Sequence, residues 1–284
     1  MIADERAVRV ATDRAALDEP SLVLAAAGIA HRVARVGVEW HLGVDANDLD
    51  RAHGALEAYD RERPRDAVRE PDGGRSYVGV IVAVLLVAFY VVSGPTDPAT
   101  RWSRAGSASA ERILHGEPWR TVTALTLHAD PAHVAGNAVA CAVFVTAVAR
   151  VLGPGVGVAL VLLAGAGGNA LNAVLHGAHH DSVGASTAVF GAIGLLGGLA
   201  FRRRRGERRA WLPIGASLGL LAMLGVGERA DLLAHLFGLL VGGALGVAAA
   251  VALVRRPGRG VQRALAVAAL AAIAGCWALA LGPP

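Results

Sequence analysis

Four polar residues in otherwise apolar segments have the types and spacing needed for acyl-transfer chemistry. Ser186 lies in the stretch VGASTAVFGAIG, and His235 lies in AHLFGLLVGG. A serine hydroxyl activated by a histidine is the minimal nucleophile–base pair for attack on a carbonyl. His133 and Asn137 lie four residues apart in HVAGN. They therefore project from one face of a helix, where their donors could bind a developing oxyanion.

The same residues have a second interpretation that involves no catalysis. A serine is tolerated in an apolar helix because its hydroxyl can bond to a carbonyl of the preceding turn, so Ser186 alone favours a structural role. An ionisable or amide group inside a membrane costs roughly a few kcal/mol, which makes His235 harder to explain by packing. His235 could instead be a hydrogen-bond donor between helices, and His133 and Asn137 could form a polar helix face that lines a water-filled cavity, as in a transporter.

Glycines near the two candidate residues predict that their helices pack closely. Each segment carries three glycines at spacings of three or four residues, namely Gly238, Gly242 and Gly246 after His235, and Gly191, Gly194 and Gly198 after Ser186. Because small residues let helix backbones approach each other, two such faces would bring Ser186 within reach of His235.

The composition is that of an all-α polytopic membrane protein. Of the 284 residues, 54% are hydrophobic, and the mean hydropathy is +0.49, which is too apolar for an ordinary soluble domain. Both cysteines, Cys141 and Cys276, fall in apolar runs and predict buried thiols, not a disulfide. The apolar segments predict seven spans, at 77–93, 133–152, 155–176, 185–201, 210–226, 229–254 and 261–281.

All 27 basic residues that give the net charge of +4 are arginines, and nine of them cluster in two short connections between the predicted spans, 202–209 and 255–260. They indicate membrane topology, and no nucleic-acid partner is expected. The connections FRRRRGERR and RRPGRGVQR follow the fourth and sixth spans, so they share one side, which the positive-inside rule makes cytoplasmic. The N-terminus is then cytoplasmic, and the candidate residues lie near the outer ends of three spans. Arginines in the long outer connection 94–132 run against this rule.

The first 63 residues predict a small soluble α/β domain. Apolar alternation and helical spacing give the order β-α-β-β-α, with a helix end at Gly28 and a turn near Gly37. The segment carries no catalytic constellation, and its scattered histidines do not predict a metal site. Polar residues 64–76 predict a linker. The first residues lack the apolar core of a signal peptide, so we expect the first span to direct insertion.

The chain from 77 to 254 resembles the rhomboid family of intramembrane serine proteases. Four stretches carry the resemblance in order along the predicted spans: EPWRTVTALTLH, HADPAHVAGN, GASTAVFG and AHLFGLLVGG. Each motif is weakly specific alone, and the four together are strongly specific. The resemblance implies a six-helix core over 77–254, followed by one extra transmembrane helix within 255–284.

The resemblance also implies roles for individual residues. Ser186 would be the nucleophile and His235 the general base, without a third acidic member. His133 and Asn137 would stabilise the oxyanion together with the backbone N–H of Ser186. The residues with structural roles near the site would be Gly184, which supports the serine loop, and His128, Trp119 and Arg120, which shape the first outer connection, beside the packing glycines Gly238 and Gly242.

One residue departs from the family pattern. The family usually has glycine directly after the serine, whereas this chain has Thr187. A β-branched residue restricts the backbone and adds bulk near the hydroxyl. It permits chemistry if its side chain points away from the cavity, and it marks a weakened member if it does not.

Other polar residues predict structural roles. The loop HGAHHDSVG contains His176, His179, His180 and Asp181, but no Cys or Glu completes a ligand set, so neither a metal nor a cofactor is predicted. Asn169 and Asn172 predict hydrogen bonds between helices. Asp231 precedes His235 by four residues and could face the same cavity, where a triad role would require its carboxylate to reach the imidazole. At the outer boundary we expect it to be an exposed or helix-capping residue.

The function expected from these observations is intramembrane serine endopeptidase activity in the plasma membrane of a bacterium. Its partners would be the lipid bilayer and membrane-protein substrates whose transmembrane segments contain helix-destabilising residues, because a helix must unwind to expose a carbonyl. Two alternatives remain open, a catalytically inactive rhomboid-like protein that binds membrane clients and a small-solute transporter.

Overall fold

The computed structural model describes residues 5–62, 76–177, 180–203, 211–224, 231–253 and 255–282. The chain divides into two compact units, Met1–Asp72 and Gly73–Pro284. Most of the predicted linker 64–76 lies outside the described residues, as do His179 and the arginines of the predicted connection from 204 onward.

The N-terminal unit is a three-stranded antiparallel sheet with two helices. Its elements are β1 (Glu5–Ala11), α1 (Asp18–Ala26), β2 (His31–Val36), β3 (Glu39–Asp45) and α2 (Leu49–Glu62), and the sheet order is β1-β3-β2. The predicted order β-α-β-β-α is therefore confirmed. Gly28 and Gly37 have φ of 68° and 66°, and this left-handed backbone ends α1 and turns β2 into β3, as predicted. Leu24, Leu42 and Leu56 form the centre of its apolar core.

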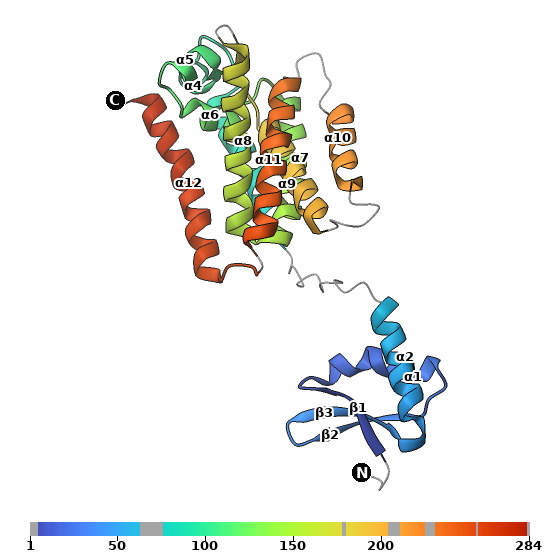
Figure 1. Ribbon diagram of the computed structural model, residues 1–284. Helices are drawn as coiled ribbons and strands as arrows, with labels where there is room; N and C mark the ends of the chain where they lie inside the picture. The colour runs from blue at the N-terminus through green and yellow to red at the C-terminus, as the bar shows by residue number, and fades with distance from the viewer. Residues whose placement is uncertain are drawn as a thin grey trace. The chain divides into compact units, whose positions relative to one another are not determined.

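The second unit is a bundle of apolar helices (Figure 1). The helices that match the seven predicted spans are α3 (Val78–Ser93), α7 (Pro131–Leu152), α8 (Pro154–His176), α9 (Ser186–Arg203), α10 (Leu212–Leu224), α11 (Leu232–Ala252) and α12 (Arg259–Leu281). Among the described residues, four of these, α7, α8, α11 and α12, are long and apolar enough to cross a membrane. Outward-facing large side chains such as Val84 and Leu270 are apolar, as expected for a surface that meets lipid.

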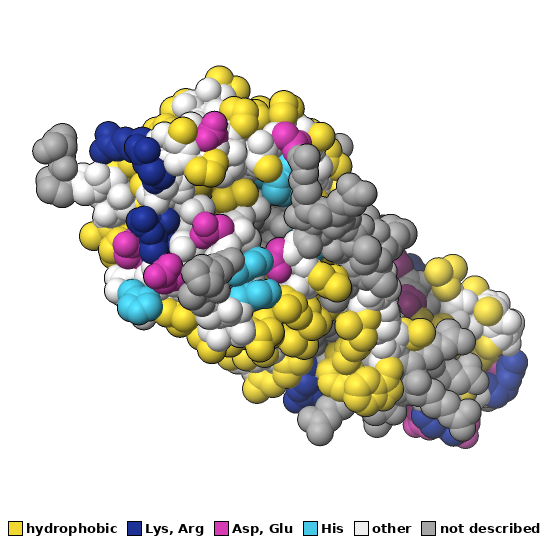
Figure 2. Space-filling view, turned by 90° about the horizontal axis from the view of Figure 1, so that it is seen from above, with side chains coloured by type: hydrophobic (Ala, Val, Ile, Leu, Met, Phe, Trp, Pro, Cys, Tyr) yellow, Lys and Arg dark blue, Asp and Glu magenta, His cyan; other side chains and the backbone are white. Residues whose placement is uncertain are grey.

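Short elements cover one end of this bundle (Figure 1). They belong mostly to the connection between α3 and α7 and comprise α4 (Arg101–Gly106), β4 (Ala108–Ser109), α5 (Ala110–Leu114), α6 (Arg120–Thr123) and the 3-10 helix η3 (Ala124–Thr126). The strand β5 (Asp181–Ser182), which lies between α8 and α9, pairs antiparallel with β4. The connection is thereby joined to the loop that leads into Ser186. Figure 2 looks onto this end, where histidine and acidic side chains gather.

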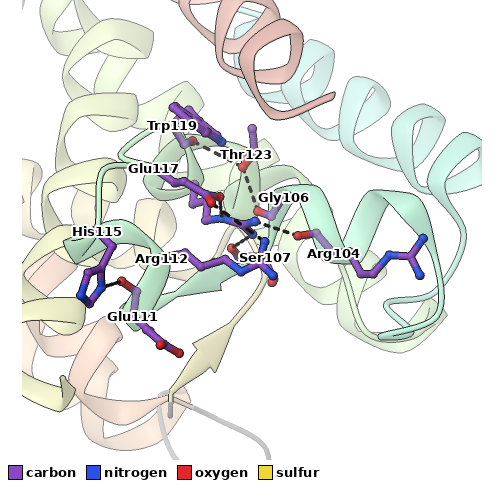
Figure 3. A network of polar contacts seen from close by, with 10 residues as sticks. Arg104, Gly106, Ser107, Glu111, Arg112, His115, Glu117, Trp119 and Thr123 are labelled. Atoms are coloured by element: carbon purple, nitrogen blue, oxygen red, sulfur yellow. Dashed lines mark hydrogen bonds and ion pairs between the residues drawn. The ribbon is translucent and has the colours of Figure 1, made fainter. Parts of the chain in front are cut away.

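A buried arginine organises this connection. The Arg120 side chain is only 2% exposed, and its Nε donates to Glu117 Oε2 at 2.6 Å. Its two terminal nitrogens donate to the backbone carbonyls of Ser107 and Arg104, at 3.0 and 2.7 Å. Figure 3 shows these groups converging, with Thr123 bonded to the Gly106 carbonyl beside them. A buried guanidinium needs such complete pairing, so Arg120 fixes the path of residues 104–123.

The glycines on α9 and α11 lie where the two helices approach most closely. A Cβ added at Gly238, Gly242 or Gly246 would meet a backbone carbonyl of α9, and one added at Gly194 or Gly198 would meet a carbonyl of α11. The backbones therefore contact each other along both helices, in the manner of small-residue packing in membranes. This contact sets the distance between the N-terminal ends of the two helices, which carry Ser186 and His235.

The last helix, α12, is attached to the bundle near both of its ends. Near its start, Gln262 Oε1 accepts from the backbone N–H groups of Gly155 and Val156, and its Nε2 donates to the Leu152 carbonyl. Near its end, Trp277 Nε1 donates to Thr126 Oγ1 at 3.1 Å. Between these points α12 packs mainly against α8 and otherwise exposes apolar side chains.

Candidate active site

Ser186 and His235 form a direct hydrogen bond. Ser186 is the first residue of α9, and His235 lies in the first turn of α11. The distance between Ser186 Oγ and His235 Nε2 is 2.8 Å. His235 is buried, with 6% of its surface exposed, whereas Ser186 is half-buried. When Nε2 accepts the hydroxyl proton, the pair has the arrangement that a general base needs.

The loop before Ser186 lies against the two polar residues of α7. Gly184 has φ of 124°, a conformation that L side chains rarely adopt. A Cβ at this glycine would stand 2.7 Å from His133 Nε2 and 3.6 Å from Asn137 Nδ2. The glycine is therefore required both by its backbone conformation and by the close approach of the two side chains. His133 and Asn137 thus lie beside the backbone that precedes the serine.

The hydrogen bonds of His133 favour one tautomer. Its Nδ1 accepts from the backbone N–H of Ala129 at 3.4 Å, so the ring proton belongs on Nε2, the atom nearest Gly184. Asp130 caps α7 by accepting from the His133 N–H at 2.8 Å, and Asn137 Nδ2 donates to the His133 carbonyl at 3.2 Å. A donor N–H at His133 Nε2, beside the serine loop, can bind an oxyanion that forms at Ser186.

His128 supports the serine loop from behind. Its side chain is fully buried, and its Nε2 accepts from the backbone N–H of Ala185 at 3.4 Å. Burial, together with the neighbouring His133, lowers the pKa of His128 to about 4. The imidazole is therefore neutral near pH 7 and keeps its role as acceptor. Trp119 and Arg120 lie in the connection between α3 and α7 and make no direct contact with Ser186 among the interactions of the described residues.

Phe190 is a site residue that the sequence analysis missed. Its ring stacks on the His235 imidazole, with 4.6 Å between centroids and a 30° tilt. Phe190 follows Ser186 by four residues and is buried on the same face of α9. That spacing was the available signal, because residues four apart on a helix share a face. The contact restricts the orientation of the imidazole toward Ser186.

Thr187 points away from the hydroxyl and into the packing between helices. Its methyl group would lie 2.6 Å from a Cβ at Gly168 of α8, and its carbonyl faces Gly238 of α11. The side chain is 4% exposed. Gly168 supplies the space that the threonine occupies, so the departure from glycine after the serine is accommodated between α8 and α11.

The remaining predicted polar residues lie outside this group. Asn169 Nδ2 donates to the Thr121 carbonyl, and Asp231 caps α11 by accepting from the Ala234 N–H, as predicted for both. His176 and His180 stack on each other. Within the described ranges, which leave out His179, no three His, Cys, Asp or Glu side chains are grouped so that they could hold a metal ion.

Comparison with known proteins gives the family. The Rhomboid domain profile matches residues 115–251. A Bacillus subtilis (strain 168) protein named "Putative rhomboid protease YdcA" is 30% identical over 166 residues, which cover 57% of this chain and 82% of that protein. This chain belongs to the rhomboid family. The resemblance stated from the four motifs is thereby confirmed, and the protein is a multi-pass membrane protein.

A second rhomboid relative is matched over a smaller share of its length. Rhomboid protease GluP of Bacillus subtilis (strain 168) is 27% identical over 190 residues, which cover 64% of this chain. The chain spans only 36% of the length of GluP. The rhomboid match of residues 115–251 includes all of the residues that surround Ser186.

Proposed function

We propose that this rhomboid is an intramembrane serine endopeptidase with Ser186 as nucleophile and His235 as general base. The observation that carries the proposal is the 2.8 Å bond between Ser186 Oγ and His235 Nε2. The two residues are 49 positions apart and come from different helices. Glycine contacts along both helices hold the two residues together. A nucleophile–base pair explains why helices so distant in the sequence pack with these two side chains in contact.

The proposed reaction proceeds through an acyl-enzyme. Ser186 Oγ attacks the scissile carbonyl while its proton passes to His235 Nε2, and the imidazolium then gives that proton to the leaving amine. His133 Nε2, Asn137 Nδ2 and the Ser186 backbone N–H stabilise the oxyanion, and one such donor is worth about 100-fold or more in rate. Water, activated by His235, hydrolyses the ester and regenerates Ser186.

The proposed membrane arrangement has seven spans. Helices α3, α7, α8, α9, α10 and α11 form the rhomboid core within residues 77–254, and α12 is the extra helix within 255–284. The arginine-rich connections place the cytoplasm at the opposite end from α4–α6. Residues 1–63 then form a cytoplasmic domain, joined by the linker 64–76. The substrate is a membrane protein whose transmembrane or juxtamembrane segment unwinds near the outer face.

Labelling and cleavage by the reconstituted full chain test the function. A fluorophosphonate should label the parent protein, and a transmembrane reporter should be cut. Ser186→Ala should abolish both, whereas His235→Ala should reduce both by at least about 1000-fold. Asp97→Ala is a suitable control, since Asp97 is exposed and its carboxylate accepts from the Ala99 N–H within the same turn. A folded parent chain that is neither labelled nor active on several reporters would favour the inactive, client-binding alternative.

A further inference from the structure

A carboxylate at the start of α11 connects two other segments near the site. Asp231 Oδ2 accepts from Asn172 Nδ2 of α8 at 2.6 Å and bonds to His180 Nε2 at 2.6 Å. The side chains of His180 and Asp231 are 27% and 15% exposed. One oxygen atom therefore joins the end of α8, the loop before Ser186 and the start of α11.

The other oxygen of Asp231 fixes the turn that carries His235. Asp231 Oδ1 accepts from the Ala234 N–H at 3.0 Å, and the Asp231 carbonyl accepts from the His235 N–H at 3.0 Å. These bonds satisfy donors at the start of α11 that no earlier helical carbonyl can reach. Movement of Asp231 would therefore move the backbone of His235.

The His180 end of the contact is equally fixed. The His180 carbonyl accepts from the Ala110 N–H at 2.8 Å, and the next two residues form β5. The His180 ring stacks on the His176 ring, with centroids 4.0 Å apart and planes inclined by 12°. The chain then runs from β5 through Gly184 into Ser186. His180 is thus held in place by backbone and ring contacts within the loop that precedes Ser186.

We propose that Asp231 is a positioning residue, which sets the distance between His235 and Ser186 by bonding α11 to the serine loop through His180 and to α8 through Asn172. The inference rests on the proposed function, because it concerns the alignment of the same two residues. The bond between Asp231 and His180 is a second connection between their segments, independent of the glycine contacts deeper in the bundle. Misplacement of a reacting group by about 1 Å can cost 100-fold in rate.

Substitution of Asp231 by Asn separates the helix-capping role of Oδ1 from the bonds of Oδ2 to His180 and Asn172. Asn keeps an oxygen that can cap Ala234, but it replaces the charged Oδ2, which bonds to both Asn172 and His180, by an NH₂ donor. Asp231→Asn should lower kcat and the rate of fluorophosphonate labelling by about tenfold, with KM nearly unchanged. If capping were the only role, Asp231→Asn would behave like the parent protein.

A double-mutant cycle tests the pairing with His180. His180→Ala should cause a similar loss, and the double variant His180→Ala/Asp231→Asn should lose no more than the larger single effect. The matched controls are Asp97→Asn and His115→Ala, both in exposed parts of the outer connection. Fully additive losses in the double variant would contradict the pairing. If Asp231→Asn does not fold, His180→Ala and Asn172→Ala test the same bonds singly.

A measurement without turnover distinguishes this inference from the proposed function. The ¹⁵N NMR signals of the His235 imidazole should shift in Asp231→Asn and stay in place in Asp97→Asn. If the parent chain is not labelled at Ser186, the proposed protease function is overturned. The shift of the His235 signals in Asp231→Asn then still decides whether Asp231 positions His235. If the parent chain is labelled, and Asp231→Asn is labelled equally fast with unshifted His235 signals, the positioning role is overturned and the proposed function stands.

Discussion

Thr187 shows how a single residue can depart from a family motif and keep the local geometry. Its side chain fills space above Gly168, while its carbonyl contacts Gly238. The bulk added next to Ser186 is thereby directed between α8 and α11 and not toward the hydroxyl. The Ser186–His235 bond is formed with the threonine in place. We therefore expect Thr187 to affect the protein through helix packing and not through direct contact with the hydroxyl.

Gly168 should be the residue that makes Thr187 acceptable. A methyl group at position 168 would stand 2.6 Å from Thr187 Cγ2 and 2.8 Å from the Gly238 nitrogen. Gly168→Ala should therefore destabilise the protein by about 1–3 kcal/mol, measured as a lower melting temperature in detergent. Adding Thr187→Gly should recover part of the loss. Gly136→Ala, with open space around its Cβ, should be neutral, and a neutral Gly168→Ala would contradict the packing argument.

His128 should make stability fall at acidic pH. Burial and His133 lower its folded pKa to about 4, whereas an unfolded histidine titrates near pH 6.5. Between these values the unfolded chain binds more protons, so stability is full above about pH 6.5 and falls as the pH drops toward 4, by at most about 3 kcal/mol. Melting temperatures across this range should show a shallower slope in His128→Asn than in the parent.

The exposed His115 supplies the control for that experiment. His115→Asn should leave the slope of the parent unchanged, since His115 is exposed in the connection between α3 and α7. Protonation of His128 in the folded protein also removes the acceptor for the Ala185 N–H, so labelling of Ser186 should decline as the pH approaches the folded pKa of about 4. Parallel slopes for His128→Asn and the parent protein would contradict the role of the buried histidine.

At the scale of the elements, two kinds of contact position the helices. The glycines of α9 and α11 bring backbones together along the helix axes, which fixes their separation. Polar side chains act at the ends, where Asp231, Gln262 and Trp277 bond to loops or to other helices. Apolar contact alone gives little preference between registers inside a lipid environment, so the directional bonds at the ends define the register.

The attachment of α12 to the bundle should depend on Gln262. Truncation to Ala would leave the Gly155 and Val156 N–H groups and the Leu152 carbonyl without their buried partner, at a cost of about 1–3 kcal/mol. Gln262→Ala should lower the melting temperature in detergent, and limited proteolysis should release α12 more readily. Arg263→Ala changes the exposed neighbour and should have little effect. Equal stability of the two variants would show that α12 is held by other contacts.

At the scale of the whole molecule, the connection between α3 and α7 joins the site to most of the helical bundle. Its strand β4 pairs with β5 just before Ser186, and its Thr126 accepts a hydrogen bond from Trp277 of α12. The connection also contains the buried Arg120. In the proposed orientation this assembly faces outward, and the arginine-rich connections face the cytoplasm.

Cysteine labelling of intact cells should establish that orientation. In a background with Cys141 and Cys276 replaced, Ala99→Cys in the connection between α3 and α4 should react with a membrane-impermeant maleimide. Arg255→Cys, in the connection between α11 and α12, should react only after the cells are broken. Both positions are exposed. The reverse pattern would overturn the proposed topology, while leaving the geometry of Ser186 and His235 unaffected.

The sequence by itself determined the features that depend on local periodicity. Apolar runs predicted the positions of seven helices, glycine spacing predicted the close face between α9 and α11, and alternation predicted the small sheet. These patterns repeat over a few residues, so they can be read without knowing which segments meet. The four rhomboid motifs likewise identified the family, because their order along the predicted spans is specific.

Only the tertiary structure decided which side chains meet across helices. The stacking of Phe190 on His235, the direction of Thr187, the attachment of α12 by Gln262 and the pairing of His180 with Asp231 each join segments that are distant in the chain or on different faces. Periodicity gives the buried face of a helix but not its neighbour, rotation or register. Those depend on the summed packing and hydrogen bonding of several helices at once, and together they place Ser186 Oγ 2.8 Å from His235 Nε2.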